Sequence, residues 1–409
     1  MKKSKLWVWV GLLPALGLAC PLWGKEGMED TIEWYDQQVY ENLQQRDDYY
    51  KKLAACGYTG IRCPDGSGGY YGFGEITDGI AAIYEATGRE YYLQRLIDYS
   101  KLMMAAGKDN NGDGYVDYYH WMKDRESYCK WDYEPGYNYG AHCYWNAMRT
   151  IARCARVGKL GPHCDKYKAD IDEIVGFVEK QVIEKWEKGD QGMTLQQWID
   201  QGHFTISGMD SHAGSLMVDA YLATGSEHIR DVATAFAEKV KGAWVLYSNG
   251  SYAWCGDGGV QIPKDCMDVT FEFGGKQYGV QDTAHSIRVI RFAAIACRAG
   301  LVVTDEDMEH LVNTFTKNLW RGDDEVFAEY VNGADREPVN PERYSCITQW
   351  VRVGAFDETA HQKLVNWTGG PRRPDKYHED RIHYYGILAL NLKLRKDGYR
   401  LYPFGDAGH

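Results

Sequence analysis

The sequence predicts an all-α toroid of six helical hairpins, an (α/α)6 ring, with a seven-hairpin (α/α)7 ring as the alternative. Three observations carry this prediction. Apolar residues recur at helical spacing through most of residues 30–395. The helical segments come in pairs, in which an apolar member precedes a more charged one. One turn motif occurs twice, as Ala86-Thr-Gly-Arg-Glu90 and as Ala223-Thr-Gly-Ser-Glu227, which is typical of stacked repeats.

The first expected helix covers residues 30–55, because Ile32, Tyr35, Val39 and Leu43 fall on one stripe at helical spacing. Helical pairs follow, and a last helix over residues 379–394 returns to pack beside the first. The expected pairs are 75–86 with 90–106, 142–157 with 165–186, two helices that meet at the turn 223–227, 282–299 with 305–320, and 344–353 with 358–367.

The first helix of each pair is rich in Ala, Ile and Val, so we expect it to line the inside of the ring. The second helix carries more Lys, Glu and Asp and is expected outside. All first helices then begin at the same end of the ring. Long loops precede them at 107–138, 187–209, 244–281 and 321–343. Loops of more than about 15 residues are more often functional than idle, so we expect the functional site at that end.

Residues 21–409 are expected to form a single domain, because a closed ring can use this whole length. The net charge of −12 argues against a general nucleic-acid-binding protein, although local charge can still attract an acidic polymer. No phosphate-binding glycine loop, His-Glu-x-x-His helix or Gly-x-Ser-x-Gly elbow occurs in a fitting context. We therefore expect no nucleotide cofactor, no serine-hydrolase chemistry and no required cofactor.

Residues 1–20 have the pattern of a secretory signal, with three lysines followed by an apolar run over residues 6–19. The run is too short for a membrane span. Either cleavage after Ala19 or lipidation of Cys20 fits its end. We expect an exported protein that is periplasmic, secreted or lipid-anchored at the cell surface, with no membrane contact besides that anchor.

Ten further cysteines remain, an even number that predicts disulfides in an oxidising compartment. None has the spacing of a zinc site. The expected pairs are Cys56 with Cys63, Cys129 with Cys143, Cys154 with Cys164, Cys255 with Cys266, and Cys297 with Cys346.

Polar residues collect where the expected inner helices begin. In the stretch 278–297, Asp282 or Thr283 can cap a helix, and His285 and Arg288 share one face of its first turns. A capped surface helix with solvated arginines is the alternative. The candidates at the helix starts are Glu75, Asp78, Asn138, Tyr139, His142, Asp210, His212, Tyr278, Asp282, His285, Arg288, His383 and Tyr384.

The loops that lead to these helices are rich in aromatic residues, among them Trp131, Tyr252 and Trp254. Aromatic rings with polar rims provide flat faces for sugar rings. We therefore expect these residues, with Asn138, Tyr139 and Tyr384, to bind a carbohydrate. Packing between loops is the alternative.

One loop matches the first nine positions of a calcium-binding loop, through Asp109, Asn111, Asp113 and Asp117. Its twelfth position is His120 in place of the usual bidentate glutamate. Either a structural calcium ion or an ordinary Asx-Gly turn fits this pattern.

The chain resembles exported bacterial polysaccharide lyases with an (α/α) toroid, especially the alginate and glucuronan lyase families. The resemblance covers most of residues 30–395 and includes Asn138-Tyr-Gly-Ala-His142-Cys-Tyr-Trp145, His212 and His285. It implies an acidic polysaccharide substrate, such as alginate or glucuronan, that is cut by β-elimination.

In β-elimination the enzyme neutralises a uronate carboxylate, removes the neighbouring proton and protonates the leaving oxygen. The resemblance implies His212 or His142 as the base or the carboxylate neutraliser, with His285 nearby. It implies Arg288 as a carboxylate clamp and Tyr278 as the acid, or as both acid and base. Tyr139 is the reserve for Tyr278.

Two rival functions remain open. A glycoside hydrolase on the same ring would use two carboxylates among Asp78, Asp210 and Asp282. A non-catalytic glycan-binding surface protein would need the aromatic residues but no acid and base. The fold cannot decide between them.

Overall fold

The computed structural model describes residues 29–59, 69–109, 112–122, 125–128, 139–188, 208–254, 270–273, 276–323, 327–335, 349–367, 378–398 and 402. The predicted signal segment 1–20, with Cys20, lies outside the described residues, as do Asn111, Trp131 and Asn138. Cys63, Cys129, Cys255, Cys266 and Cys346 also lie outside the described residues. Each of them belongs to one of four expected disulfides.

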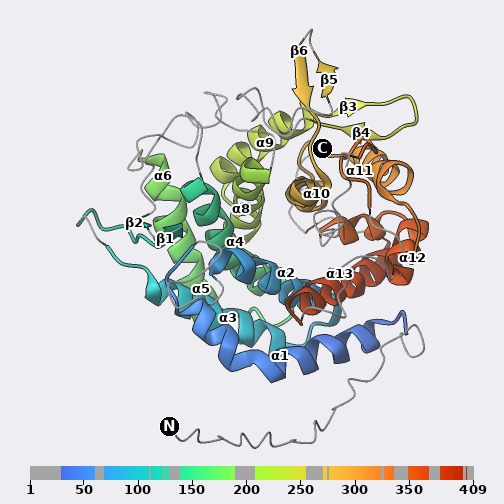
Figure 1. The fold of residues 1–409 in the computed structure, drawn as a ribbon. Coiled ribbons are helices and arrows are strands. Elements are labelled where there is room, and N and C mark those ends of the chain that lie inside the picture. The colour runs from blue at the N-terminus through green and yellow to red at the C-terminus, as the bar shows by residue number, and fades with distance from the viewer. Residues whose placement is uncertain are drawn as a thin grey trace, which may run out of the picture.

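Inner helices surround a central axis, and outer helices wrap around them (Figure 1). In the described part of the chain the inner set is α2 (Tyr70–Thr87), α4 (Tyr139–Leu160), α8 (Gly208–Thr224), α10 (Thr283–Arg298), the short 3₁₀-helix η4 (Trp350–Ala355) and α13 (His378–Asp397). Each packs against the next, and α13 packs against α2, so the ring closes. The predicted six-hairpin toroid is confirmed.

The outer helices run between successive inner ones, as expected from their charge. They are α1 (Ile32–Ala54), α3 (Glu90–Ala106), α5 (Lys168–Phe177) continued by the π-helix η1 (Val178–Glu184) and α6 (Lys185–Glu187), α9 (Glu227–Lys241), α11 (Asp305–Asn313) continued by the π-helix η3 (Thr314–Leu319), and α12 (Glu358–Asn366). The first helix, α1, lies against α13 and α2, so both ends of the described chain meet at one place in the ring.

The inner helices run parallel, so they all begin at one end of the ring, which we call the loop end. Glu75 near the start of α2 pairs with Arg291 of α10 at 2.7 Å, whereas Glu85 near the end of α2 pairs with Arg298 at 3.3 Å. Because the later residue of one helix pairs with the later residue of the other, the two helices run in the same direction. The prediction that the first helices begin at one end is therefore correct.

The repeated turn motif has the same geometry in both places. Gly88 and Gly225 adopt the left-handed conformation, with φ of 66° and 69°, which glycine tolerates best. Thr87 and Thr224 each donate from the hydroxyl to a carbonyl one turn earlier, at 2.7 and 2.9 Å. The motif thus ends an inner helix and turns the chain outward at both positions.

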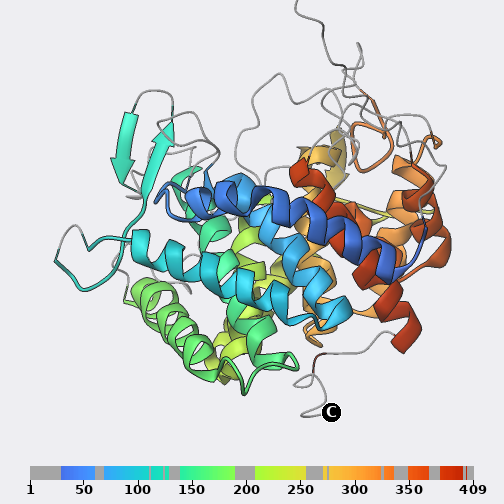
Figure 2. The same cartoon turned by 90° about the horizontal axis from the view of Figure 1, so that it is seen from below.

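Small antiparallel hairpins interrupt the loops that precede α4 and α10, which the prediction of an all-helical chain did not include. They are β1 (Tyr119–Met122) with β2 (Arg125–Tyr128), β3 (Val245–Leu246) with β4 (Tyr252–Ala253), and β5 (Thr270–Phe273) with β6 (Lys276–Gly279). The β1–β2 hairpin projects from the periphery of the ring in both views (Figures 1 and 2). Within the described residues, no helix combines the length and apolar character needed to cross a membrane.

One expected disulfide is wrong, because Cys154 and Cys164 are both free thiols. Cys154 lies on α4 facing Ser100 of α3, and burial raises the pKa of its thiol to about 12. The inner helices also carry charged side chains where they meet at the axis, since side chains of α2, α4, α8 and α10 pair there.

Candidate active site

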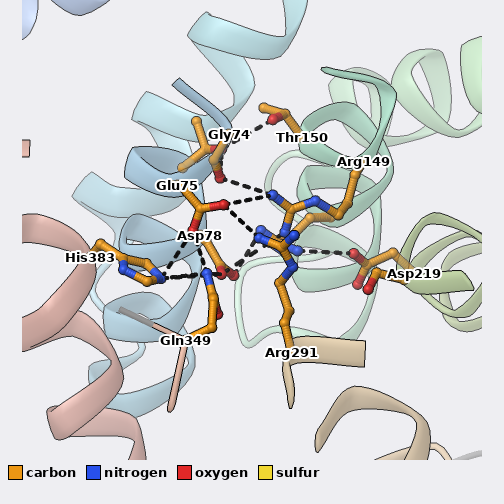
Figure 3. Close-up of polar contacts among 12 residues, drawn as sticks. Gly74, Glu75, Asp78, Arg149, Thr150, Asp219, Arg291, Gln349 and His383 are labelled. Carbon is orange, nitrogen blue, oxygen red and sulfur yellow. Dashed lines mark hydrogen bonds and ion pairs between the residues drawn. The ribbon is translucent and has the colours of Figure 1, made fainter. Parts of the chain in front are cut away.

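Two carboxylates one turn apart on α2 face the centre of the ring near the loop end (Figure 3). The side chain of Glu75 is 26% exposed, whereas that of Asp78 is 2% exposed. Small residues of α2 let neighbouring helices approach these carboxylates. A Cβ at Gly74, for example, would lie 3.1 Å from the side chain of Asn146 on α4.

Glu75 receives contacts from several elements around the ring. Arg291 Nη1 of α10 lies 2.7 Å from Oε1, and Arg149 Nη2 of α4 lies 3.7 Å from the same oxygen. The amide of Gln349, just before η4, donates to Oε2, and His383 Nε2 of α13 lies 3.5 Å away. Four elements distant in sequence thus fix one partly exposed carboxylate.

Asp78 lies one turn deeper and is held more tightly. Arg153 Nη1 of α4 and Arg352 Nη2 of η4 both lie 2.7 Å from Oδ1. Gln349 donates to Oδ2 at 2.9 Å, and His383 Nε2 lies 3.4 Å from that oxygen. We call these side chains the axial cluster: Glu75, Asp78, Arg149, Arg153, Arg291, Gln349, Arg352 and His383.

The axial cluster keeps both carboxylates ionised. Burial alone would raise the pKa of Glu75, but the charges of Arg291, His383 and Arg149 outweigh burial and hold that pKa at about 2. Burial would likewise raise the pKa of Asp78, but the charges of Arg153 and Arg352 hold that pKa well below its usual range. Glu75 is therefore an anion near neutral pH and cannot serve as a proton donor there.

His212 is one of the predicted site residues that the structure brings to the axis. It is 1% exposed, and its Nδ1 lies 2.8 Å from Arg291 Nη2. Because Arg291 also contacts Glu75, this arginine links His212 to the axial cluster. The arginine of α10 that makes these contacts is Arg291, whereas the predicted clamp, Arg288, lies three residues earlier and is half-buried.

His285 lies at the first turn of α10. Asp282 caps this helix, as predicted, since its Oδ1 accepts from the backbone N–H of His285 at 3.0 Å. Its Oδ2 lies 2.6 Å from His285 Nδ1, and the His285 side chain is 48% exposed. His285 and Asp282 therefore form a local pair at the helix start.

The backbone positions of four other predicted site residues are described, but their side chains are not. Tyr139 and His142 lie in the first turn of α4, Asp210 lies in the first turn of α8, and Tyr278 lies in β6, directly before α10. Asn138 and Trp131 lie outside the described residues.

The predicted sugar-binding aromatics that are described take part in packing. Trp254 is fully buried and stacks on Trp350, with ring centroids 6.3 Å apart. The hydroxyl of Tyr252 donates to Asp307 on the outer helix α11 at 2.9 Å. Tyr384 is buried, and its hydroxyl donates to a backbone carbonyl of α12 at 2.8 Å. These contacts correspond to the alternative of loop and core packing.

In the predicted calcium loop, each described aspartate accepts a hydrogen bond or pairs with a cation. The two oxygens of Asp109 accept from backbone N–H groups of the following turn at 2.7 and 2.9 Å. Asp113 accepts from the backbone of Tyr115 at 2.7 Å, and Asp117 pairs with Lys185 at 2.6 Å. This geometry is that of an Asx turn followed by an ion pair.

Glu75, Asp78 and His383 place one ligand atom each within 4.8 Å of one another, which is close enough for a metal ion. Arg149, Arg153, Arg291 and Arg352 contact the same carboxylates. A cation at this point would face four guanidinium groups at short range. The donor set therefore does not fit a metal, and we assign it none.

The arginines of the axis were not predicted, although the sequence carries a signal for them. Arg149, Arg153 and Arg156 stand at positions i, i+4 and i+7 of α4, so they share one face of a helix that is otherwise apolar and small. Arg291 and Arg298 repeat the seven-residue spacing on α10. Charged residues at the spacing of a buried stripe indicate a polar interior.

The sequence matches no protein-family model and no curated protein. A glycosyl hydrolase family 88 structure from Bacteroides vulgatus matches 89% of this chain and 99% of its own, with 13% identity and a TM-score of 0.52. The α-1,6-mannanase GH76A of Salegentibacter sp. HEL1_6, in complex with α-1,6-mannotetrose, matches 88% of this chain and 99% of its own, with 12% identity and a TM-score of 0.45. At 13% identity the likeness to the family 88 structure shows the fold alone.

The predicted lyase activity is contradicted by these matches. The matched structure with a TM-score above 0.5 is a glycosyl hydrolase and not a lyase, so β-elimination and an alginate-lyase identity have no support. The roles that the lyase resemblance gave to Tyr278, His142, His285 and Arg288 fall with it. What stands is the fold: the chain forms a helical toroid of the kind found in carbohydrate-active enzymes.

Proposed function

We propose that this protein is a glycoside hydrolase whose active site lies at the loop end of the ring, with Glu75 as its ionised carboxylate. The observation that carries the proposal is the convergence of α4, α10, α13 and the start of η4 on Glu75, which is itself partly exposed. Glycoside hydrolysis needs a pair of carboxyl groups, one ionised and one protonated. Glu75 has the properties of the ionised member.

The protonated member must come from a neighbouring helix start. Asp282 is occupied as the cap of α10 and as the partner of His285. Asp78 is buried and bound by arginines, so it acts as a positioning residue for the ion pairs around Glu75. Of the three carboxylates that the sequence offered, Asp210 is the one we propose as the acid. It lies in the first turn of α8, two residues before His212.

In the proposed reaction Asp210 gives its proton to the glycosidic oxygen while the bond from that oxygen to the anomeric carbon breaks. A transition state with positive charge on the sugar ring forms next to the anionic Glu75, which stabilises it. One water molecule adds to the anomeric carbon, and its proton passes to a carboxylate. Each cut consumes one water and releases one new reducing end.

We propose a polysaccharide as the substrate. An acidic polymer is the finer expectation, and it is supported by the positive charge of Arg149 and Arg291, which are buried beside Glu75 and would act on a polymer through their charge without touching it. A polymer also fits the expected export of the chain, since polysaccharides are met outside the cell.

The test is turnover on a panel of α-1,6-mannan, alginate and glucuronan, measured as new reducing ends. We expect reducing ends from one polymer, without the ultraviolet absorbance of an unsaturated uronate. Glu75→Gln and Asp210→Asn should each lower kcat by at least about 10³-fold, since each removes a proton-transfer or charge-stabilising group. Asp282→Asn is the control and should retain most activity.

Two results would overturn the proposal. Turnover that survives in both the Glu75 and the Asp210 variants would mean that the site is elsewhere. Binding of a polymer without any new reducing end would favour a glycan-binding protein.

A further inference from the structure

Next to the axial cluster, on the side away from the loop end, the inner helices line a partly open cavity of about 20 Å³. Such a volume holds one water molecule or one small ion, but no sugar. Alanines of α2, α10 and the end of η4 supply much of the wall. The charged groups of the lining are Asp78, Glu85, Arg153, Arg156, Arg291, Arg298 and Arg352.

Positive charge predominates around this cavity. Five arginines and two carboxylates line it. Two further carboxylates touch these arginines, since Asp219 pairs with Arg156 at 2.7 Å and Glu75 pairs with Arg291 at 2.7 Å. With Arg149, six guanidinium groups face four carboxylates among the described residues.

Arg149, Arg153, Arg156 and Arg291 are buried, whereas the side chains of Arg298 and Arg352 are 12% and 13% exposed. Guanidinium groups stay protonated in proteins, and an uncompensated buried charge costs several kcal/mol. Burial lowers the pKa of Arg149, and repulsion from Arg291 and Arg153 adds to that effect. The Nε of Arg291, which lines the cavity, is buried and has no hydrogen-bond partner among the described residues. A donor in this position is suited to an anion.

Tyr402 covers part of the cavity near the ends of the inner helices. Its ring packs on Arg298 and Arg156, whose guanidinium carbons lie 4.1 and 4.9 Å from the ring centroid. Its hydroxyl donates to Glu85 at 2.9 Å. The aromatic cover and the alanine wall reduce the contact of the charges with bulk water, which strengthens their attraction for a small anion.

We propose that this cavity binds one small monovalent anion of halide size, which adds negative charge among the arginines at the centre of the ring. The site lies next to the proposed active site, and Asp78, Arg153, Arg291 and Arg352 belong both to the axial cluster and to the lining of the cavity. Neither its occupant nor its role in stability depends on the proposed hydrolase activity.

The test is thermal unfolding of the full chain in sodium gluconate, with chloride or bromide replacing gluconate at constant ionic strength. We expect Tm to rise with the logarithm of the halide concentration, by about 3 °C when the halide exceeds its Kd by 100-fold. A crystal grown with bromide should show one anomalous peak inside the cavity.

Arg298→Gln removes one lining charge and should reduce the halide-dependent rise in Tm. The matched control is Arg230→Gln on the outer helix α9, where the arginine pairs with Glu227 and is 38% exposed. Equal Tm values in gluconate and halide, or a cavity without bromide, would overturn the proposal. The wild-type crystal decides the matter even if Arg298→Gln does not fold.

Discussion

At the scale of single residues, the ionisation of Glu75 and Glu85 depends on their neighbours. Burial would raise the pKa of both carboxyl groups, yet the charges of the surrounding arginines outweigh it. Glu85 is the simpler case, because its side chain is 15% exposed and its partners are Arg156, Arg298 and Tyr402. Such a group stabilises the fold only while it is ionised.

The pKa of Glu85 is about 2 in the folded protein, against an ordinary value of 4.5. A depressed pKa stabilises the fold above pH 4.5, and this contribution is lost as the pH falls towards 2. The free energy of unfolding that is lost in this way is on the order of 3 kcal/mol. Urea unfolding should therefore give a constant free energy from pH 7 to about 5 and a steep fall below.

Glu85→Gln should lower the free energy of unfolding at pH 7, because it leaves buried arginines uncompensated. Below pH 4.5 its stability should fall less steeply than that of the wild type. Glu309→Gln, on the exposed face of α11, is the control and should follow the wild-type curve. Parallel curves for the wild type and Glu85→Gln would show that this carboxylate is not the titrating group.

At the scale of elements, the contact of α2 with α13 closes the ring and depends on two glycines. A Cβ on Gly79 would lie 2.4 Å from the carbonyl oxygen of Ile382, and a Cβ on Gly386 would lie 2.3 Å from the carbonyl oxygen of Gly79. Both clashes involve backbone, which cannot move without separating the helices. The same contact places His383 of α13 against Glu75 and Asp78.

Gly79→Ala should lower the free energy of unfolding by about 3 kcal/mol, since overpacking of a core costs about 1–3 kcal/mol and this clash is with backbone. Gly72→Ala, on the same helix, is the matched control because no atom lies within 4 Å of its added Cβ. It should be neutral or stabilise by up to about 1 kcal/mol. Equal effects of the two substitutions, measured by urea unfolding, would contradict the close crossing.

At the scale of the whole molecule, a polar axis inside an apolar ring connects the proposed active site at the loop end to the arginine-lined cavity beyond it. Glu75 and Arg291 mark the loop end of this axis, and Glu85, Arg298 and Tyr402 mark its deep end. Tyr402, which follows the last helix, is buried and forms part of this interior.

Tyr402→Ala should destabilise the whole ring by about 3–5 kcal/mol, as removal of a buried aromatic ring does in other cores. It also takes a hydroxyl from Glu85 and a ring from two arginines. Tyr402→Phe keeps the ring and should cost only about 1 kcal/mol, the value of one hydrogen bond. Thermal unfolding of both variants tests this order, and the reverse order would contradict it.

The ring, the repeated turn and the cap of α10 could be predicted, because each depends on residues close in sequence. Thr87 with Gly88, or Asp282 with His285, interact within one turn of helix. The axial cluster could not be predicted, since Glu75 meets Arg291 across 216 residues and Gln349 meets Asp78 across 271. No local sequence pattern predicts which arginine pairs with which carboxylate.

The prediction of β-elimination was wrong for a related reason. Histidines at helix starts suggested proton transfer, but His212 is buried against Arg291 and His285 pairs with its own helix cap. A ring of this kind accommodates more than one chemistry, so the residues at the axis decide the reaction.

The most direct test of the central claim is the fate of water during the cut. The polymer that the enzyme degrades is incubated in oxygen-18 water, and the products are analysed by mass spectrometry. Hydrolysis at Glu75 and Asp210 predicts one oxygen-18 atom in each new reducing end, and no label in the Glu75→Gln reaction. Products that lack the label and have lost the elements of water would contradict it.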